Sequence, residues 1–299
     1  MDSKQKHCPL ADAEELPPGP GPKLQRFKHY ASRIGWLARL DEDPPGCSNE
    51  SSEAYVFKVM INTELYALKV FYNAEDDKYF WDPYVANDPV SRTDRKRQAE
   101  LHLDPFYAEC RAYGQINTAM KQGHIQRDIA VPCFGFMFLD DSYRKVLDDY
   151  GVDLKESCLD GDSSPVSYRG PEPRESNSER PIRCTVKKLA SAEHGITQTT
   201  IHTIRKDIQQ LNLLKVYNHN VRIHNFCGGK LASFTWSRTE PHCFITADNA
   251  DLSSQLRNGD LAMLEDVVDG IGLLVTWRTT GNTAYRGKLR RRSQNDAVK

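Results

Sequence analysis

The chain has 299 residues, of which 39% are hydrophobic and 27% charged, and its formal net charge is −1. This size predicts one large globular unit or two lobes with a sizeable core, and the charge balance gives no sign of a nucleic-acid or membrane partner. The eight cysteines are scattered and contain no C-x-x-C pair. That spacing argues against a zinc ribbon or a disulfide scaffold and favours reduced thiols.

Composition divides the chain into four stretches. Residues 1–24 are polar and then rich in proline and glycine, which predicts a disordered N-terminal arm. Residues 25–190 read as a β-rich lobe with an inserted loop at about 148–180, and residues 191–285 as a short helical lobe. Residues 286–299 form a basic tail, which suits either nuclear import or simple solvation. No segment resembles a signal peptide or a membrane span, so we expect an intracellular protein, nuclear or cytoplasmic.

The first ordered elements are three successive strands. Residues Ile34–Leu40, Tyr55–Met60 and Leu65–Tyr72 are rich in aliphatic and aromatic residues. The polar tripeptide Asn62-Thr63-Glu64 turns the chain between the last two. Strands joined in this way predict an antiparallel meander.

Lys69 lies in the third of these strands, where both faces are otherwise apolar or aromatic. A buried ammonium group needs a partner of opposite charge. The alternative is an edge-strand lysine whose side chain reaches water.

A helix is predicted at Pro105–Ala119, with Asp104 as its cap and Pro105 at its first position. Phe106 and Tyr113 recur at helical spacing and define an inward face, and Glu109 shares that face. A buried carboxylate also needs a partner, so we expect Lys69 and Glu109 to meet. This pair either holds a phosphate ligand or is a structural ion pair without one.

The remaining elements complete an α+β pattern. Strands are predicted at Val131–Leu139 and Ile182–Leu189, a helix from Thr199 or Thr200, and a last helix from near Asp260. Between the two helices lie a polar loop, the turn Gly228-Gly229 and a short strand that leads to Phe234.

This order of parts resembles the protein-kinase superfamily from about Ile34 to Leu273. More narrowly, the local sequence is similar to that of the fungal inner-kinetochore family known as the Fta-two subunit of the Sim-four complex. Four stretches carry the resemblance: Tyr66–Phe71, Pro105–Gly114, Val131–Gly135 and Gly229–Leu231 with Phe234 and Trp236. It implies a bilobal kinase-like fold with a β-rich N-lobe, protein partners such as kinetochore subunits, and ATP as the one cofactor to consider, held by Lys69, Glu109 and Asn225.

The family's catalytic pattern is degenerate in this chain. Asn220 stands where the resemblance implies the catalytic aspartate, and an amide is not a base at neutral pH. Ser233 stands where it implies the metal-binding aspartate, so the main fixed charge for Mg²⁺ is missing. Ala54 replaces a glycine of the phosphate loop. The stretch after Ser233 is also shorter than a full kinase lobe, so we expect a truncated helical lobe.

The preferred hypothesis is therefore a pseudokinase that acts as a binding or scaffold module, with no confident catalytic residue and no metal site. A second hypothesis is an atypical ATP-dependent phosphotransferase, in which Asp207, Asp248 or a carboxylate of the loop Asp41–Glu53, between the first two strands, replaces the lost groups. A third is a metal site built from His219, His224 and either His202 or His242, whose spacing fits no common zinc signature.

Overall fold

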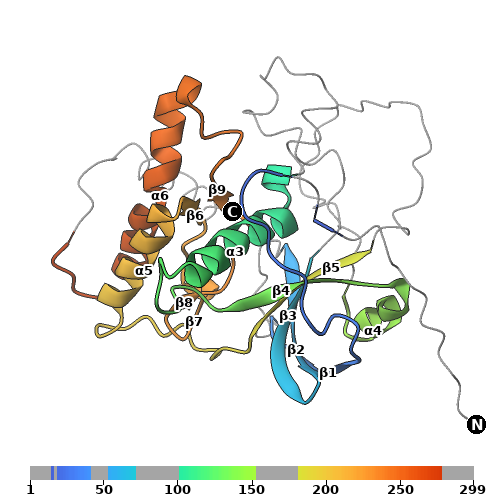
Figure 1. Ribbon diagram of the computed structural model, residues 1–299. Helices are drawn as coiled ribbons and strands as arrows, with labels where there is room; N and C mark the ends of the chain where they lie inside the picture. Colours follow the sequence, from blue (N-terminus) through green and yellow to red (C-terminus); the bar gives the residue numbers. More distant parts are fainter. Residues whose placement is uncertain (1–14, 17–18, 42–52, 72–100, 153–180, 278–299) are drawn as a thin grey trace, which may run out of the picture.

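The computed structural model describes residues 15–16, 19–41, 53–71, 101–152 and 181–277. Most of the predicted N-terminal arm, the inserted loop from residue 153 onward and the basic tail lie outside the described residues. Within the described part, a five-stranded sheet and a helical region lie on opposite sides of one central helix, α3 (Pro105–Lys121) (Figure 1).

The sheet is antiparallel throughout and has the order β1-β2-β3-β5-β4. A tight turn joins β2 to β3, and its residues Asn62 and Thr63 have positive φ angles of 48° and 68°. The predicted meander is confirmed, and the third strand occupies the centre of the sheet. The strands are β1 (Ile34–Arg39), β2 (Ala54–Ile61), β3 (Glu64–Phe71), β4 (Cys133–Leu139) and β5 (Ile182–Lys188).

Strand alternation gives the sheet two different faces. One face is apolar and fully buried: Phe57 pairs with Leu68 across β2 and β3, and both side chains are 0% exposed. It packs against Leu147 of the short helix α4 (Arg144–Asp149). The other face carries Lys69, because successive side chains point to opposite sides of a strand. A slip of one residue in register would exchange the two faces, so burial of the apolar set fixes where Lys69 points.

Helix α3 begins as predicted. The Asp104 carboxylate accepts hydrogen bonds from the backbone N–H groups of Phe106 (2.9 Å) and Tyr107 (3.2 Å), and Pro105 occupies the first turn. Gly114 lies on the buried side, where a Cβ atom would come within 2.3 Å of the Pro22 carbonyl oxygen. The end of the N-terminal arm therefore crosses α3 at this glycine, and Leu24, which sequence analysis assigns to the disordered arm, is buried there.

The helical region contains α5 (Ile201–Leu213) and α6 (Ala250–Gly270). The prediction that the last helix starts near Asp260 is wrong, because α6 begins ten residues earlier. Asn258 and Gly259 are poor helix formers, which weakens the helical pattern of the sequence before Asp260. In the structure Gly259 and Asp260 are buried in the middle of the helix, so tertiary contacts outweigh local propensity. Two small ladders accompany these helices: β6 (Val216–Tyr217) with β9 (Arg238–Thr239), and β7 (Phe226–Cys227) with β8 (Lys230–Leu231).

The arrangement is α+β, with a β-rich part, a bridging helix and a short helical part. The predicted α+β class is thus confirmed. None of the described helices has the length and apolarity needed to span a membrane.

Candidate functional site

Glu109 of α3 is the centre of a buried polar cluster. Its Oε2 atom lies 2.8 Å from Lys69 Nζ of β3 and accepts a 3.0 Å hydrogen bond from the backbone N–H of Phe234. Its Oε1 atom lies 2.6 Å from Lys187 Nζ and accepts a 2.9 Å hydrogen bond from the Thr185 hydroxyl, both of β5. The structure thus brings Lys69 and Glu109 together, as expected, but a second lysine shares the carboxylate.

Two ammonium groups on one carboxylate leave the cluster with one positive charge in excess. Burial alone pushes the pKa of Glu109 upward, but Lys187 and Lys69 outweigh it and lower the pKa to about 2. The pKa of Lys69 is lowered, first by burial and also by repulsion from Lys187, while Glu109 works in the opposite direction. The charged form of Glu109 is therefore strongly favoured, and Lys69 is held beside a like charge.

Sequence reasoning missed Lys187. The signal was present, because Ile182, Cys184 and Val186 alternate with polar residues along the same strand. The polar face of β5 lies along α3: Arg183 pairs with Asp104 at 2.9 Å, and Thr185 and Lys187 both contact Glu109. On the β3 side, the cross-strand neighbour of Lys187 is Ala67, and that of Thr185 is Lys69.

Ser233 completes the cluster on the side of the helical region. Lys69 Nζ donates to the Ser233 hydroxyl at 2.9 Å, and Lys187 Nζ donates to the carbonyl of the preceding residue, Ala232, at 2.6 Å. At the position where the resemblance implies a carboxylate, a neutral hydroxyl therefore accepts a hydrogen bond from the strand lysine. A hydroxyl adds no negative charge to attract Mg²⁺.

The loop that carries Asn220 is held by Asp260 from inside α6. The Asp260 carboxylate accepts hydrogen bonds from the backbone N–H groups of Asn218 (2.7 Å) and His219 (2.8 Å). His219 has a positive φ of 56°, which is uncommon for a residue with a side chain. Burial raises the pKa of Asp260 to about 6, and the two backbone donors limit the rise. Sequence analysis did not predict this contact, because the partners of Asp260 are backbone groups 41 and 42 residues away.

Side-chain amides organise the rest of the loop. Asn218 Nδ2 donates to the Ser233 carbonyl at 2.7 Å, and Asn218 Oδ1 accepts from the Asn220 N–H at 3.0 Å. Asn225 Nδ2 donates to the Asn220 carbonyl at 2.8 Å. Asn220 and Asn225, two of the predicted positions, are thus joined to each other, and Asn218 links their loop to Ser233.

Two of the carboxylates considered as replacements, Asp207 and Asp248, lie outside the Glu109 cluster. Asp207 of α5 forms an ion pair with Lys230 at 2.6 Å and another with Arg127, and Asp248 is exposed in a single 3₁₀ turn. Among the described residues, the one group with metal-ligand spacing is His102, His242 and Cys243. It includes His242 but none of His219, His224 and His202, so the predicted histidine site is not assembled.

One further contact links the start of β2 to the segment after Ser233. Trp236 donates its indole N–H to Glu53 Oε1 at 2.7 Å, and its side chain is 48% exposed. Glu53 directly precedes β2, in the region that the resemblance assigns to the phosphate loop. Burial lowers the pKa of Lys69, and the Glu53 carboxylate is one of the groups that partly oppose this electrostatically. A fixed negative charge therefore lies within electrostatic reach of Lys69.

Comparison with known proteins gives one family. The family model described as "Kinetochore Sim4 complex subunit FTA2" matches residues 12–238. No curated protein matches the sequence. Among solved structures, that of vaccinia related kinase 3 is similar to this chain, with 12% sequence identity and a TM-score of 0.42. The match covers 95% of this chain and 77% of the kinase chain. The family match covers most of the chain, and the chain therefore belongs to the kinetochore Sim4 complex subunit FTA2 family.

Proposed function

We propose that this chain is a noncatalytic, kinase-like binding subunit of a kinetochore complex, with protein partners and a nuclear location. Family membership supports the assembly, and the site supports the loss of catalysis. The proposal includes the division of the chain into a β-rich part, residues 25–190, and a short helical part, residues 191–285. The observation that carries the loss of catalysis is the bond from Lys69 to Ser233, because the metal-binding carboxylate would stand at that position.

Phosphoryl transfer depends on positioning and on charge stabilisation by metal ions. Ser233 gives no charged oxygen for Mg²⁺, and Asn220 gives no base, a group that is typically worth about 10²- to 10⁴-fold in rate. Asn225 already donates its amide to Asn220. The polar network therefore stabilises the loop against the sheet but lacks the groups that would move a phosphoryl group.

The same network supports a rigid binding surface. Glu109 of α3 binds three side chains of the central strands: Lys69, Lys187 and Thr185. The same carboxylate also accepts the Phe234 N–H, which connects α3 to the helical region. Removal of one partner from a buried ion pair typically costs about 3–5 kcal/mol. This part of the molecule should hold one arrangement, as a scaffold requires.

The test of catalysis uses the purified full chain with ATP and either Mg²⁺ or Mn²⁺. We expect turnover no higher than that of a Lys69→Met variant. Turnover that exceeds this control would support the alternative function, an atypical ATP-dependent phosphotransferase.

The test of assembly is affinity purification of the tagged chain from its own cells, with fluorescence localisation. Recovery of kinetochore proteins and a punctate nuclear signal are expected. A diffuse signal without kinetochore proteins would contradict the proposed assembly.

A second candidate function is binding of ATP without turnover, and the excess positive charge of the cluster favours it. Lys69, Glu109 and Asn225 are the predicted site residues. Ligand binding to the native state raises its stability by RT ln(1 + [L]/Kd). A thermal shift with millimolar ATP that is equal with and without Mg²⁺ is the expected result. No shift in either condition would exclude this function.

A further inference from the structure

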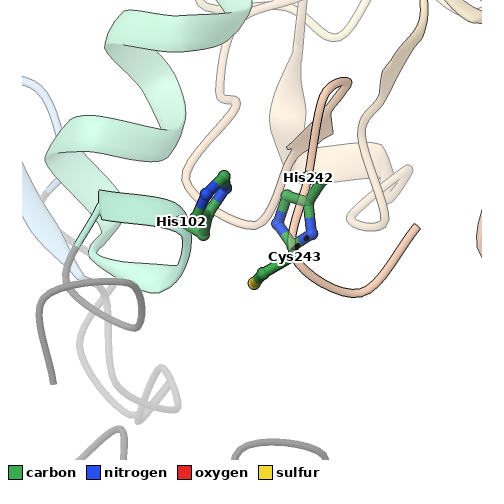
Figure 2. A group of neighbouring side chains, drawn as sticks. All are labelled: His102, His242 and Cys243. Carbon is green, nitrogen blue, oxygen red and sulfur yellow. Dashed lines mark hydrogen bonds between the residues drawn. The ribbon is translucent and has the colours of Figure 1, made fainter. Parts of the chain in front are cut away.

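Three potential metal ligands meet where the start of α3 lies against the loop after β9. His102 lies two residues before Asp104, the cap of α3, and His242 and Cys243 follow β9 by a few residues. One ligand atom from each of the three residues lies within 4.8 Å of the others. Figure 2 shows the His102 ring approaching from the α3 side, and His242 and Cys243 from the loop. These residues are about 140 positions apart in sequence, so the fold itself brings them together.

Both imidazole rings are buried, with 7% exposure at His102 and 4% at His242, and they contact each other edge to face at 4.7 Å between centroids. In the described structure His102 Nδ1 has no hydrogen-bond partner. A buried polar atom without a partner costs roughly 1–3 kcal/mol. A bound cation at His102 Nδ1 would offset this cost.

His242 Nδ1 lies 3.9 Å from Cys243 Sγ and accepts a 3.1 Å hydrogen bond from the Phe244 N–H. Because that hydrogen bond occupies the lone pair of Nδ1, coordination of a cation through this atom would replace it. Neutral imidazole and thiolate are the forms in which these side chains bind zinc.

We propose that His102, His242 and Cys243 form a site for a divalent cation of the zinc class, with two nitrogen ligands, one sulfur ligand and an open fourth position. A set of imidazole and thiolate ligands suits Zn²⁺, and three protein ligands are the number found where the fourth position stays exchangeable. Nothing in the family match assigns this site, and it is independent of the nucleotide site at Lys69.

Coordination needs only a small contraction of the cluster. Zn–N bonds of about 2.0–2.1 Å and Zn–S bonds of about 2.3 Å place two nitrogens and one sulfur roughly 3.3–3.6 Å apart in tetrahedral geometry. The observed upper limit of 4.8 Å exceeds this by about 1 Å. Side-chain rotation of Cys243, which is only partly buried, supplies movement of this size.

Two arginines act electrostatically on the site. Arg111 and Arg238 both disfavour positive charge at the two histidines, so they oppose a bound cation. Arg111 also interacts electrostatically with Cys243. Arg111 is also engaged by carbonyl oxygens, those of Thr239 (2.8 Å) and Pro241. We therefore expect binding that is selective for soft cations and weaker than in a four-ligand structural site.

The site would connect the start of α3 to the loop after β9. The contacts of Arg111 with Thr239 and Pro241 join the same two segments. A cation at this point would thus hold the start of α3, the helix that carries Glu109, against the loop after β9. It would make no contact with the Glu109 cluster.

The experiment titrates the purified full chain with Zn²⁺ and, separately, with Co²⁺, and compares it with His102→Gln, Cys243→Ala and the control Cys227→Ala, a partly buried thiol outside the cluster. We expect one Zn²⁺ per chain, an ultraviolet thiolate-to-cobalt band, and a rise in thermal midpoint that a chelator reverses. Cys243→Ala and His102→Gln should each bind at least tenfold more weakly, and the control should bind as the wild type does.

Equal Zn²⁺ affinity in the wild type and Cys243→Ala, or a cobalt complex without a thiolate band, would overturn the proposal. Circular dichroism establishes that each variant is folded. If His102→Gln does not fold, Cys243→Ala decides alone, because its partly exposed side chain can be removed with less disturbance to the core.

Discussion

Lys187 Nζ lies 2.6 Å from one oxygen of Glu109, and this contact makes the ion pair between Lys69 and Glu109 one half of a three-residue cluster. The two lysines repel each other, and each partly substitutes for the other as a counter-charge. The energetic role of either lysine therefore depends on the presence of the other.

The first prediction concerns this dependence. Lys69→Met and Lys187→Met should each reduce the free energy of unfolding by about 1–2 kcal/mol, because Glu109 keeps one ammonium partner. The double variant should lose more than the sum by about 1–3 kcal/mol, since it leaves a buried carboxylate without a counter-charge. Urea denaturation measures all three. Lys188→Met is the control, because Lys188 is the exposed neighbour on β5 and should change little. Additive losses would contradict a shared carboxylate.

The second prediction is a loss of stability in acid from Glu109. Its folded pKa of about 2 lies below the ordinary value of 4.5, so the unfolded state binds the proton more readily. The contribution is present above pH 4.5 and is lost as the pH falls toward 2. Carbon NMR of the Glu109 carboxyl group should show a midpoint near the lower value. A midpoint close to 4.5 would show that the lysines do not hold the charge.

Asp260 gives a third prediction, of opposite sign. Its folded pKa of about 6 exceeds the ordinary 3.8, so its contribution is present below pH 3.8 and is lost as the pH rises through 6. Asp260→Asn should remove this component, and its unfolding free energy should change less than that of the wild type between pH 4 and pH 6. Because the amide oxygen replaces a carboxylate that serves two N–H groups, a lower overall stability is also expected. An unchanged pH profile would contradict the assignment.

The fourth prediction concerns Glu53, the acid that acts on Lys69 and is bound to Trp236. Glu53→Gln removes a negative charge near the place where a phosphate would bind, and it should tighten ATP binding several-fold, roughly 1 kcal/mol. Isothermal titration with ATP measures this. Glu193→Gln, a change at an exposed acid outside the cluster, should have no effect. Equal ATP affinity in Glu53→Gln and the wild type would show that the Glu53 charge does not affect nucleotide binding.

Local patterns predicted the elements that build the site, and long-range contacts account for what was missed. Alternation in β3 and helical spacing in α3 were enough to place Lys69 and Glu109 on facing surfaces. Lys187 escaped because its role depends on β5 pairing with β3, a contact between segments more than 100 residues apart. Asp260 escaped because its partners are backbone N–H groups, which carry no side-chain signal. Prediction of the site from sequence was thus limited in two ways: by contacts between segments far apart in the chain, and by side chains whose partners are backbone groups.

The last prediction uses Gly114, where two physical effects compete. Alanine is favoured over glycine in a helix by about 1 kcal/mol, so Gly114→Ala would stabilise an isolated α3. In the folded chain, however, the new Cβ would lie 2.3 Å from the Pro22 carbonyl oxygen and 2.8 Å from the Leu24 nitrogen. Both are backbone atoms, so relief of the clash requires the backbone of residues 22–24 to move, which costs free energy of folding. We expect the clash to dominate, with a net loss of about 1–3 kcal/mol and faster proteolysis near residues 20–24. Gly270→Ala is the control, because its Cβ would meet nothing within 4 Å at the end of α6, and it should be neutral or slightly stabilising. If Gly114→Ala also proved stabilising, the arm would not be packed against α3 at this glycine.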